Sequence, residues 1–410
     1  MKLKKILIPF SFILSTLYLF SCGPNEPGDP PELVPIPGYQ HDIPWPSLAD
    51  SPCPMQNATP QRISWLNGNI PTSFDVNWVI DTLNISSGIV ADNNENIYFP
   101  SPPYLYSISK EGKINWKLKL GVYSNITPII TSSNEIIVYF QSPSKITSVS
   151  TNGTINWELE LNFNLTSQIN IGKMGELYFI SKNTFYIVKD SQIVSSMHDI
   201  RIANLFSISI DGYYAYIVSN SSSILALNLT TNSIEWEIGK GRNMSPPIVN
   251  SSGNIYFSSV IENFNNGNPA LFCVTPDAEI LWFFPHSQYS KSGLPVEFTY
   301  PAGTLDKYGN YCFGSDTLYS VSYDGKLNWK YVPDRSIGSY IISDENQNTL
   351  FLKDNGNSFG ILVISMKGQV IFESQSNYLV GNSTRYHGII LDNRLIIPTQ
   401  DKFLYSIGGL

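Results

Sequence analysis

The chain has 410 residues and a formal net charge of −8, from 25 Lys and Arg against 33 Asp and Glu. Only 14% of its residues are charged, whereas 42% are apolar and 13% are aromatic. The acidic balance, with no cluster of basic residues, excludes nucleic acid as a partner. The length and apolar content are sufficient for a large core within one folded domain.

Residues 1–21 predict a secretory signal. Three lysines in the first five residues precede an apolar run at 6–20, which is too short for a comfortable membrane span. The run ends in "LFSC" at 19–22, which resembles the lipobox of bacterial lipoproteins. This resemblance implies cleavage before Cys22 and attachment of lipid to Cys22. The alternative is an ordinary signal peptide followed by an incidental cysteine.

Residues 22–60 predict an extended tether, because they are dense in Pro and Gly. The folded domain is expected at 61–410. A lipid on Cys22 would supply the affinity for a membrane. We therefore expect a lipid-anchored protein of the bacterial cell envelope, at the outer membrane or the cell surface.

An internal repeat runs through the rest of the chain. "GKINWKLKLG" at 112–121 is echoed by "GTINWELELN" at 153–162, and further copies follow about every forty residues. The repeated aromatic position is occupied by Trp78, Trp116, Trp157, Trp236, Trp282, Trp329 and Phe372. A degraded copy, "KDSQIVSS" at 189–196, lies in the double-length interval between two of the tryptophans. The repeat therefore has eight copies.

Each copy predicts four short strands. At 86–120, apolar segments rich in Ile, Val, Tyr and Phe alternate with turns such as "DNNEN" and "KEG". Four-stranded units of this length, repeated radially, are typical of a β-propeller. We predict an all-β, eight-bladed β-propeller of four-stranded antiparallel blades. Seven blades is the alternative, if the weak unit at 165–200 is not a separate blade.

The two ends of the repeat predict how the ring closes. The last copy reaches the C-terminus after three strands, without the strand that carries the aromatic residue. A strand of that kind, "FDVNWVIDT" at 74–82, stands alone before the first copy. Joining the two completes the eighth blade and leaves no open sheet edge.

The repeated aromatic residues are expected to be structural. One ring at a fixed place in the outermost strand of each blade should pack between neighbouring sheets. The alternative, stacking on a ligand, would need the rings to converge on one pocket, whereas radial repetition spreads them around the rim.

The remaining cysteines are Cys53, Cys273 and Cys312. Three cysteines allow at most one disulfide, so the fold is not a disulfide scaffold. Cys273 and Cys312 lie in predicted strands of adjacent blades, where we expect buried free thiols. A bridge between these two is the alternative.

The repeat also resembles a known family. "PPIVNSSGNIYFSS" at 246–259 and "LYSVSYDGKLNWKY" at 318–331 resemble the PQQ-like repeat of the quinoprotein alcohol dehydrogenases. The resemblance covers most of 60–410 and implies a propeller. A catalytic member would be expected to carry a neighbouring cysteine pair, a calcium ion held by carboxylates and an Asp base.

The sequence offers no such chemistry. No two cysteines are adjacent, and "DNNEN" and "DKYGN" are explained as hairpin turns. His41, His198, His286 and His387 stand far apart, and no nucleophile elbow or phosphate-binding loop is present. We therefore assign no catalytic residue, no metal site and no cofactor, with a quinone (PQQ)-dependent dehydrogenase as the alternative.

The plan of lipobox, tether and eight PQQ-like blades is similar to that of the scaffold lipoproteins of the outer-membrane β-barrel assembly machine. We expect a non-catalytic envelope protein that binds a protein or glycan partner through one propeller face, in the manner of an assembly scaffold. A surface glycan-binding module is a further alternative. The sequence does not set the oligomeric state.

Strand order predicts which face would bind. In a four-stranded meander the first and third turns share one face, and here they are short. The second turns and the links between blades share the other face, which carries long insertions at 261–270 and 283–300. The candidate partner-binding residues there are Phe283, Phe284, His286, Tyr289, Phe298 and Tyr300. Alternatively, these loops only fold back over the ring.

Overall fold

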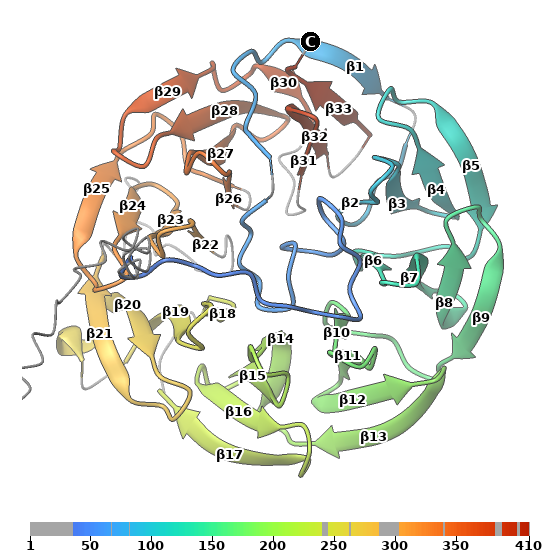
Figure 1. The fold of residues 1–410 in the computed structure, drawn as a ribbon, viewed down its shortest axis with the longest axis horizontal. Coiled ribbons are helices and arrows are strands. Elements are labelled where there is room, and N and C mark those ends of the chain that lie inside the picture. The colour runs from blue at the N-terminus through green and yellow to red at the C-terminus, as the bar shows by residue number, and fades with distance from the viewer. Residues whose placement is uncertain are drawn as a thin grey trace, which may run out of the picture. The chain divides into compact units, whose positions relative to one another are not determined.

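Eight antiparallel sheets stand around a ring, each built from strands that follow one another in the chain (Figure 1). The prediction of an all-β, eight-bladed propeller is confirmed. The alternative of seven blades is wrong, because the degraded copy forms a four-stranded sheet of its own. One sheet has a short fifth strand.

This computed structural model describes residues 36–410 apart from 67, 82, 240–244, 262–263, 287–302, 339–340, 382–387, 400–401 and 410. The predicted signal and Cys22 lie outside the described residues. All the described residues except Ile36 belong to one compact unit, Pro37–Leu410.

The first four blades follow the repeat in chain order. Blade 1 consists of β2 (Val90–Ala91), β3 (Ile97–Ser101), β4 (Tyr104–Ile108) and β5 (Ile114–Lys119). Blade 2 consists of β6 (Ile129–Ile130), β7 (Glu135–Gln141), β8 (Ser144–Ser150) and β9 (Ile155–Glu160). Blade 3 consists of β10 (Asn170–Ile171), β11 (Leu177–Ser181), β12 (Thr184–Lys189) and β13 (Gln192–His198). Blade 4 consists of β14 (Ile202–Ile208), β15 (Tyr214–Ser219), β16 (Ile224–Asn228) and β17 (Ser233–Ile238).

The other four blades complete the ring. Blade 5 consists of β18 (Ile248–Val249), β19 (Ile255–Val260), β20 (Pro269–Val274) and β21 (Ile280–Pro285). Blade 6 consists of β22 (Thr304–Leu305), β23 (Tyr311–Gly314), β24 (Leu318–Val321) and β25 (Leu327–Tyr331). Blade 7 consists of β26 (Ile342–Ser343), β27 (Thr349–Asp354), β28 (Ser358–Ile364) and β29 (Val370–Glu373), with β30 (Leu379–Val380) beside β28. Blade 8 joins β31 (Ile389–Leu391), β32 (Arg394–Pro398) and β33 (Leu404–Ile407) to β1 (Val76–Ile80).

Blade 8 closes the ring as predicted. Strand β1 pairs with β33 in antiparallel fashion, with Trp78 opposite Ser406. Beyond the strand, the Gly408 amide donates a 2.8 Å hydrogen bond to the Asp75 carbonyl. The two ends of the propeller are thus held together by one sheet, which closes the ring.

The core lies between the sheets. The inner strand β3 is buried throughout, whereas the outermost strand β5 alternates between exposed and half-buried side chains. This pattern fits a strand that packs on a neighbouring sheet with one face and meets water with the other. The only helical element among the described residues is a single 3₁₀ turn, Asn265–Gly267. In this described part of the chain, no helix has the length and apolar character to cross a membrane.

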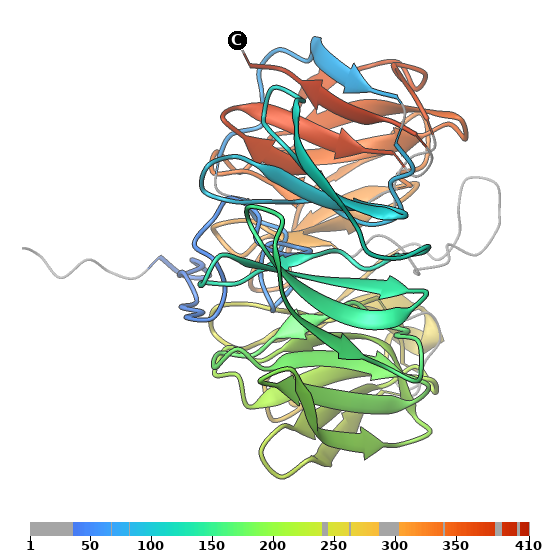
Figure 2. The same cartoon turned by 90° about the vertical axis from the view of Figure 1, so that its right-hand side faces the viewer.

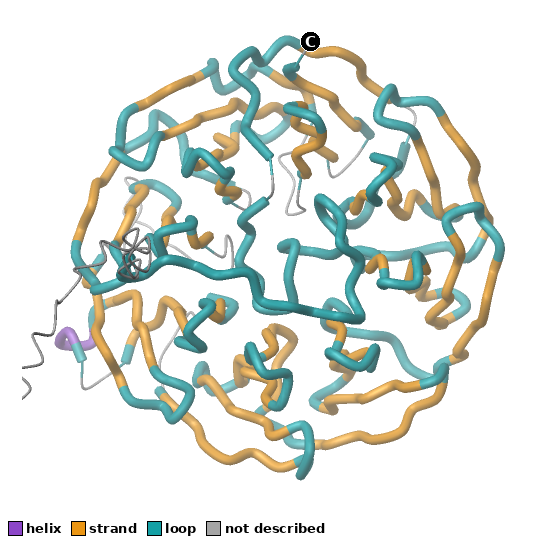
Figure 3. Tube along the Cα trace, in the orientation of Figure 1, coloured by secondary structure: helices purple, strands orange, loops and turns teal. Residues whose placement is uncertain are grey.

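The segment Pro37–Pro60 differs from the expected tether, because it packs against the propeller. It crosses the middle of the ring without regular secondary structure (blue in Figure 1, teal in Figure 3). Trp45 and Cys53 are buried, and the Trp45 indole N–H donates to the Ile171 carbonyl at 3.0 Å. The Ala91 amide bonds to the Cys53 carbonyl at 2.9 Å. The segment therefore ties together the first strands of several blades.

The two faces of the ring differ in what covers them. We call the face of the strand 1–2 and strand 3–4 turns the hairpin face, and the other the link face. The N-terminal segment lies on the hairpin face, where the Ser132 amide, in a strand 1–2 turn, bonds to the Ser47 carbonyl at 2.8 Å. Figure 2 shows this segment at one edge of the stacked blades.

Candidate functional site

Most of the repeated tryptophans join one blade to the next. The ring on the fourth strand of one blade reaches the strand 3–4 turn of the following blade, and we call the surface that receives it the ring site. Four indole N–H groups donate to a turn carbonyl: Trp78 to Lys110 at 2.9 Å, Trp116 to Thr151 at 2.8 Å, Trp236 to Pro276 at 2.9 Å and Trp282 to Tyr323 at 2.9 Å. These aromatic side chains are structural, since they are distributed around the propeller and do not converge on one pocket.

Ring sites usually contain a glycine with positive φ. A Cβ at Gly112 or Gly153 would lie 3.0 Å from the indole of Trp78 or Trp116, respectively. The glycine therefore permits both the backbone conformation of the turn and the close approach of the ring. In blade 5 Ala278 holds the same place with φ of 67°.

Two aromatic positions vary this arrangement. Trp329 is buried above Gly368, but its indole N–H has no hydrogen-bond partner in the described structure. Phe372 stacks on Phe74, with ring centroids 4.0 Å apart and planes inclined by 17°. Both rings still join neighbouring blades.

Blade 3 breaks the pattern on its side facing blade 2. Its strand 3–4 turn is a two-residue hairpin in which Asp190 and Ser191 have φ of 49° and 57°. This turn is shorter than the turns of the other ring sites and contains no glycine. Trp157, which would dock there, forms no hydrogen bond through its indole N–H with the described residues.

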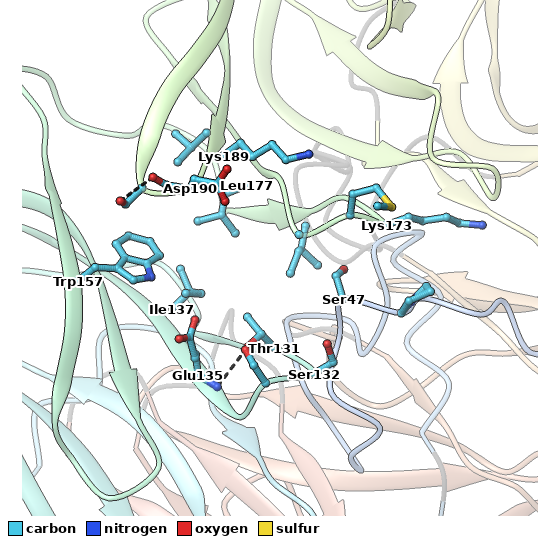
Figure 4. A pocket seen from close by; sticks show the side chains of 17 residues that line it. Ser47, Thr131, Ser132, Glu135, Ile137, Trp157, Lys173, Leu177, Lys189 and Asp190 are labelled. Carbon is cyan, nitrogen blue, oxygen red and sulfur yellow. Dashed lines mark hydrogen bonds between the residues drawn. The ribbon is translucent and has the colours of Figure 1, made fainter.

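A pocket of about 450 Å³ remains beside Trp157, and we call it the Trp157 pocket. Figure 4 shows the indole on one side and Lys189 and Asp190, from the short turn, on another. Ser47 of the N-terminal segment forms part of the wall, and its hydroxyl donates to the Gly172 carbonyl at 2.5 Å. The pocket therefore opens on the hairpin face.

The Trp157 pocket combines an aromatic ring with charged and hydroxyl groups. Glu135 on one side accepts a 3.3 Å hydrogen bond from Asn156, and Lys189 on the other forms a 3.0 Å ion pair with Glu176. Lys173 lies 5.2 Å from the Trp45 ring centroid, in cation–π geometry. Such a mixture suits binding by stacking and hydrogen bonds, because neither a nucleophile–base pair nor a cluster of acids is present in its lining.

The partner-binding residues expected from the sequence are only partly described. Tyr289, Phe298 and Tyr300 lie outside the described residues, so their role stays a prediction. Phe283 is partly exposed at the end of β21, with its ring centroid 6.0 Å from that of Phe272. The ring centroid of Phe284 lies 5.8 Å from that of Tyr319, and the ring centroid of His286 lies 5.3 Å from that of Phe313. Phe284 and His286 therefore pack at the blade 5–blade 6 boundary, whereas Phe283 packs on Phe272, which belongs to the apolar cluster between blades 4 and 5.

The three cysteines of the propeller unit are buried free thiols, as expected for Cys273 and Cys312. Burial raises the pKa of the Cys53, Cys273 and Cys312 thiols to about 12 in each case. The bridge between Cys273 and Cys312 is not formed. Thiols with such pKa values are poor nucleophiles at neutral pH.

Buried aspartates serve the hairpin turns. Asp92 accepts hydrogen bonds from the amides of Asn94 and Asn96, both at 2.9 Å, within "DNNEN". Asp306 does the same for Tyr308 and Asn310 within "DKYGN", at 2.8 and 2.9 Å. Burial raises the pKa of the Asp306 carboxyl. The interpretation of both segments as turns is confirmed.

These residues do not fit a quinone with a calcium ion. The buried carboxylates are each engaged by their own turn, and the free thiols lie in separate strands or segments. Within the described ranges, no group of three or more His, Cys, Asp and Glu side chains is placed to hold a metal ion.

No protein-family model matches the sequence, and no curated protein does. Solved structures share the fold. BamB from Moraxella catarrhalis is 14% identical, with a TM-score of 0.57 over 82% of this chain and 98% of that one. Quinohemoprotein alcohol dehydrogenase from Comamonas testosteroni is 8% identical, with a TM-score of 0.61 over 87% and 81%. A europium-containing methanol dehydrogenase is 10% identical, with a TM-score of 0.61 over 85% and 89%.

These likenesses place the chain in one class of fold. It is an eight-bladed β-propeller structurally similar to BamB and to PQQ-dependent dehydrogenases. At such low identity the similarity concerns the fold alone, and function depends on the sites that the fold carries.

Proposed function

We propose that this protein is a non-catalytic, lipid-anchored component of the bacterial cell envelope that binds a partner on one face of its propeller. Cys22 carries the lipid, and the propeller holds a protein or glycan partner, as an assembly scaffold does. The partner-binding face is the hairpin face.

The observation that carries this proposal is the Trp157 pocket. A half-buried indole whose N–H has no partner in the described structure borders an open pocket on a rigid ring. Pockets with a few polar groups around aromatic walls are common binding sites. The sequence instead predicts partner binding on the link face. Binding there through Phe283, Phe284 and His286 is the alternative to binding on the hairpin face.

A quinone-dependent enzyme is the alternative function, because two of the solved structures with this fold are dehydrogenases. The chain lacks the neighbouring cysteine pair that its family resemblance would imply. Its buried aspartates are already used by turns, as described above. Both observations favour binding over catalysis.

Crosslinking in native membranes tests the proposal. The full-length tagged protein is compared with Trp157→Ala, and the membrane extract is analysed for crosslinked proteins and bound glycans. We expect a specific adduct that the variant reduces, measured at a temperature where circular dichroism shows that the variant is folded. A quinone absorbance with alcohol oxidation, after adding PQQ and calcium, would contradict the non-catalytic proposal.

A further inference from the structure

Blade 3 also breaks the aromatic pattern on its side facing blade 4. Ser195 pairs with Ile187 next to the bulge of the sheet, as Trp157 pairs with Ser148 and Trp116 with Ser107. Ser195 therefore occupies the position that holds an aromatic ring in the other seven blades. The ring site of blade 4 therefore receives no aromatic side chain from the fourth strand of blade 3.

A pocket of about 520 Å³ lies where that ring would be, and we call it the Ser195 pocket. Its lining includes Ser195 and Val194 of β13, and Leu229, Thr230 and Asn232 of the strand 3–4 turn of blade 4. Lys173, Met174 and Lys189 line both this pocket and the Trp157 pocket. The two pockets are thus neighbours on the hairpin face, on either side of one turn of blade 3.

The ring site of blade 4 keeps the features that bind an indole elsewhere. Asn232 has φ of 56° and takes the place of Gly153 in the site that receives Trp116. The strand 3–4 turn of blade 4 is one residue longer than that of blade 2, since six residues separate Leu227 from Ile234 and five separate Val149 from Ile155. Counted back from the fourth strand, Thr230 corresponds to Thr151, whose carbonyl accepts the indole N–H. The Thr230 carbonyl accepts no hydrogen bond from the described residues.

Asn232 supplies an independent sign of an unfilled site. Its side-chain amide donates to the Ser196 carbonyl at 3.2 Å, but its Oδ1 is buried without a hydrogen-bond partner in the described structure. A buried acceptor without a donor carries a desolvation cost that no hydrogen bond offsets. A second donor, such as a backbone N–H of the bound polypeptide beside the inserted ring, would remove that cost.

The Ser195 pocket has exposed apolar side chains beside charged ones, since its lining also includes Lys173, Glu176, Lys189 and Asp211. Met174 is 77% exposed, Tyr213 60% and Val194 58%. Three such side chains around one pocket are unusual for a surface that faces only water. If a partner inserted an aromatic ring into the pocket, these three side chains would bury apolar area against the partner's chain on both sides of that ring.

We propose that the Ser195 pocket binds an aromatic side chain, Trp or Tyr, of a protein partner. The inserted ring takes the place of the missing blade 3 aromatic residue, and its N–H or O–H donates to the Thr230 carbonyl. This inference rests on the proposed function, and it narrows the partner from a protein or glycan to a protein with an exposed aromatic residue.

The test uses the full-length protein in detergent micelles, labelled with ¹³C at the methionine methyl groups, and Met174→Leu assigns the Met174 signal. The probe is N-acetyl-tryptophanamide, with N-acetyl-leucinamide and methyl β-glucoside as comparisons. We expect the Met174 signal to shift with the tryptophan amide at a concentration about tenfold lower than with either comparison. An equal or stronger response to the glucoside, or to the leucine amide, overturns the proposal.

Two variants complete the test. Ser195→Trp supplies the missing ring from within the chain, so the protein should melt about 2 °C higher and the probe should no longer shift Met174. Val194→Asp places a charge beside the pocket on an exposed position and should weaken the response, whereas Val122→Asp, at an exposed position outside the pocket lining, should leave it unchanged. A shift that persists in both Ser195→Trp and Val194→Asp overturns the proposal. Native crosslinking without any partner would instead contradict the proposed function, because the probe titration needs no partner.

Discussion

The indole N–H of Trp116 in blade 1 donates a 2.8 Å hydrogen bond to the carbonyl of Thr151 in blade 2. The two residues belong to separate sheets, so this bond joins neighbouring blades rather than strands of one blade. The ring also lies over Gly153 of the same turn. The same contact between an indole N–H and a turn carbonyl recurs at Trp78, Trp236 and Trp282, so it helps to set how these adjacent sheets meet.

Replacing Trp116 by Phe should destabilise the protein more than the same change at Trp157. Trp116→Phe loses the hydrogen bond to Thr151 and should lower the free energy of unfolding by about 1–2 kcal/mol. Trp157→Phe loses no such bond and should cost less than about 1 kcal/mol. Urea unfolding followed by circular dichroism measures both. Equal losses would show that the hydrogen bond contributes nothing.

Gly153→Ala should be more harmful than Gly175→Ala, although both glycines have a positive φ, of 88° and 85°. The backbone strain is therefore matched. A Cβ at Gly153 would meet the Trp116 ring at 3.0 Å, whereas one at Gly175 would have nothing within 4 Å. We expect an additional loss of about 1 kcal/mol for Gly153→Ala, measured as a difference in urea midpoints. A larger loss at Gly175 would contradict the ring contact.

The sequence was sufficient for the ring and its closure, because both depend on local patterns. Hairpin turns such as that around Gly153 and the recurring Trp position set the strands, and the lone strand at Trp78 indicated the closing pair. The packing of 37–60 could not be predicted from its Pro-rich composition, because Trp45 and Cys53 form hydrogen bonds with strands far along the chain.

The pockets of blade 3 were missed for a different reason. The short turn at Asp190 and the serine at 195 were visible as a degraded copy. What a missing ring leaves behind depends on packing between blades, which a periodic pattern in one blade does not report. A systematic comparison of the copies, position by position, would have pointed to Ser195.

The buried thiols should be protected from alkylation. In a chain with Cys22→Ala, only Cys53, Cys273 and Cys312 remain. With pKa values raised by burial to about 12, roughly one thiol in ten thousand is ionised at pH 8. We expect no labelling by iodoacetamide in the native protein and full labelling in denaturant. Rapid native labelling at pH 8 would contradict this burial.

The same thiols predict that the stability of the fold decreases at alkaline pH. Their pKa values rise from 9.0 to about 12 on folding, so the fold favours the neutral form. That contribution is fully present below pH 9 and is lost as the pH rises from 9 to about 12. The urea midpoint should therefore fall across this alkaline range. A midpoint that stays level up to pH 12 would contradict the shifts.

Cys22→Ala should abolish lipid attachment, as the "LFSC" segment predicts. The variant should remain uncleaved or become soluble, since a lipid chain supplies most of the membrane affinity. Labelling with a palmitate analogue and detergent phase partitioning measure the two effects. Unchanged partitioning of the variant would contradict the lipid anchor.

Photo-crosslinking from the two faces of blade 3, in native membranes, tests the central claim most directly. A photoreactive residue is placed at Met174, on the hairpin face, or at Lys182, an exposed position in the strand 2–3 turn of the same blade on the link face. The account predicts a specific adduct from Met174 that Ser195→Trp diminishes, and none from Lys182. An adduct from Lys182 or from Phe283, with none from Met174, would place the partner on the link face and contradict the account.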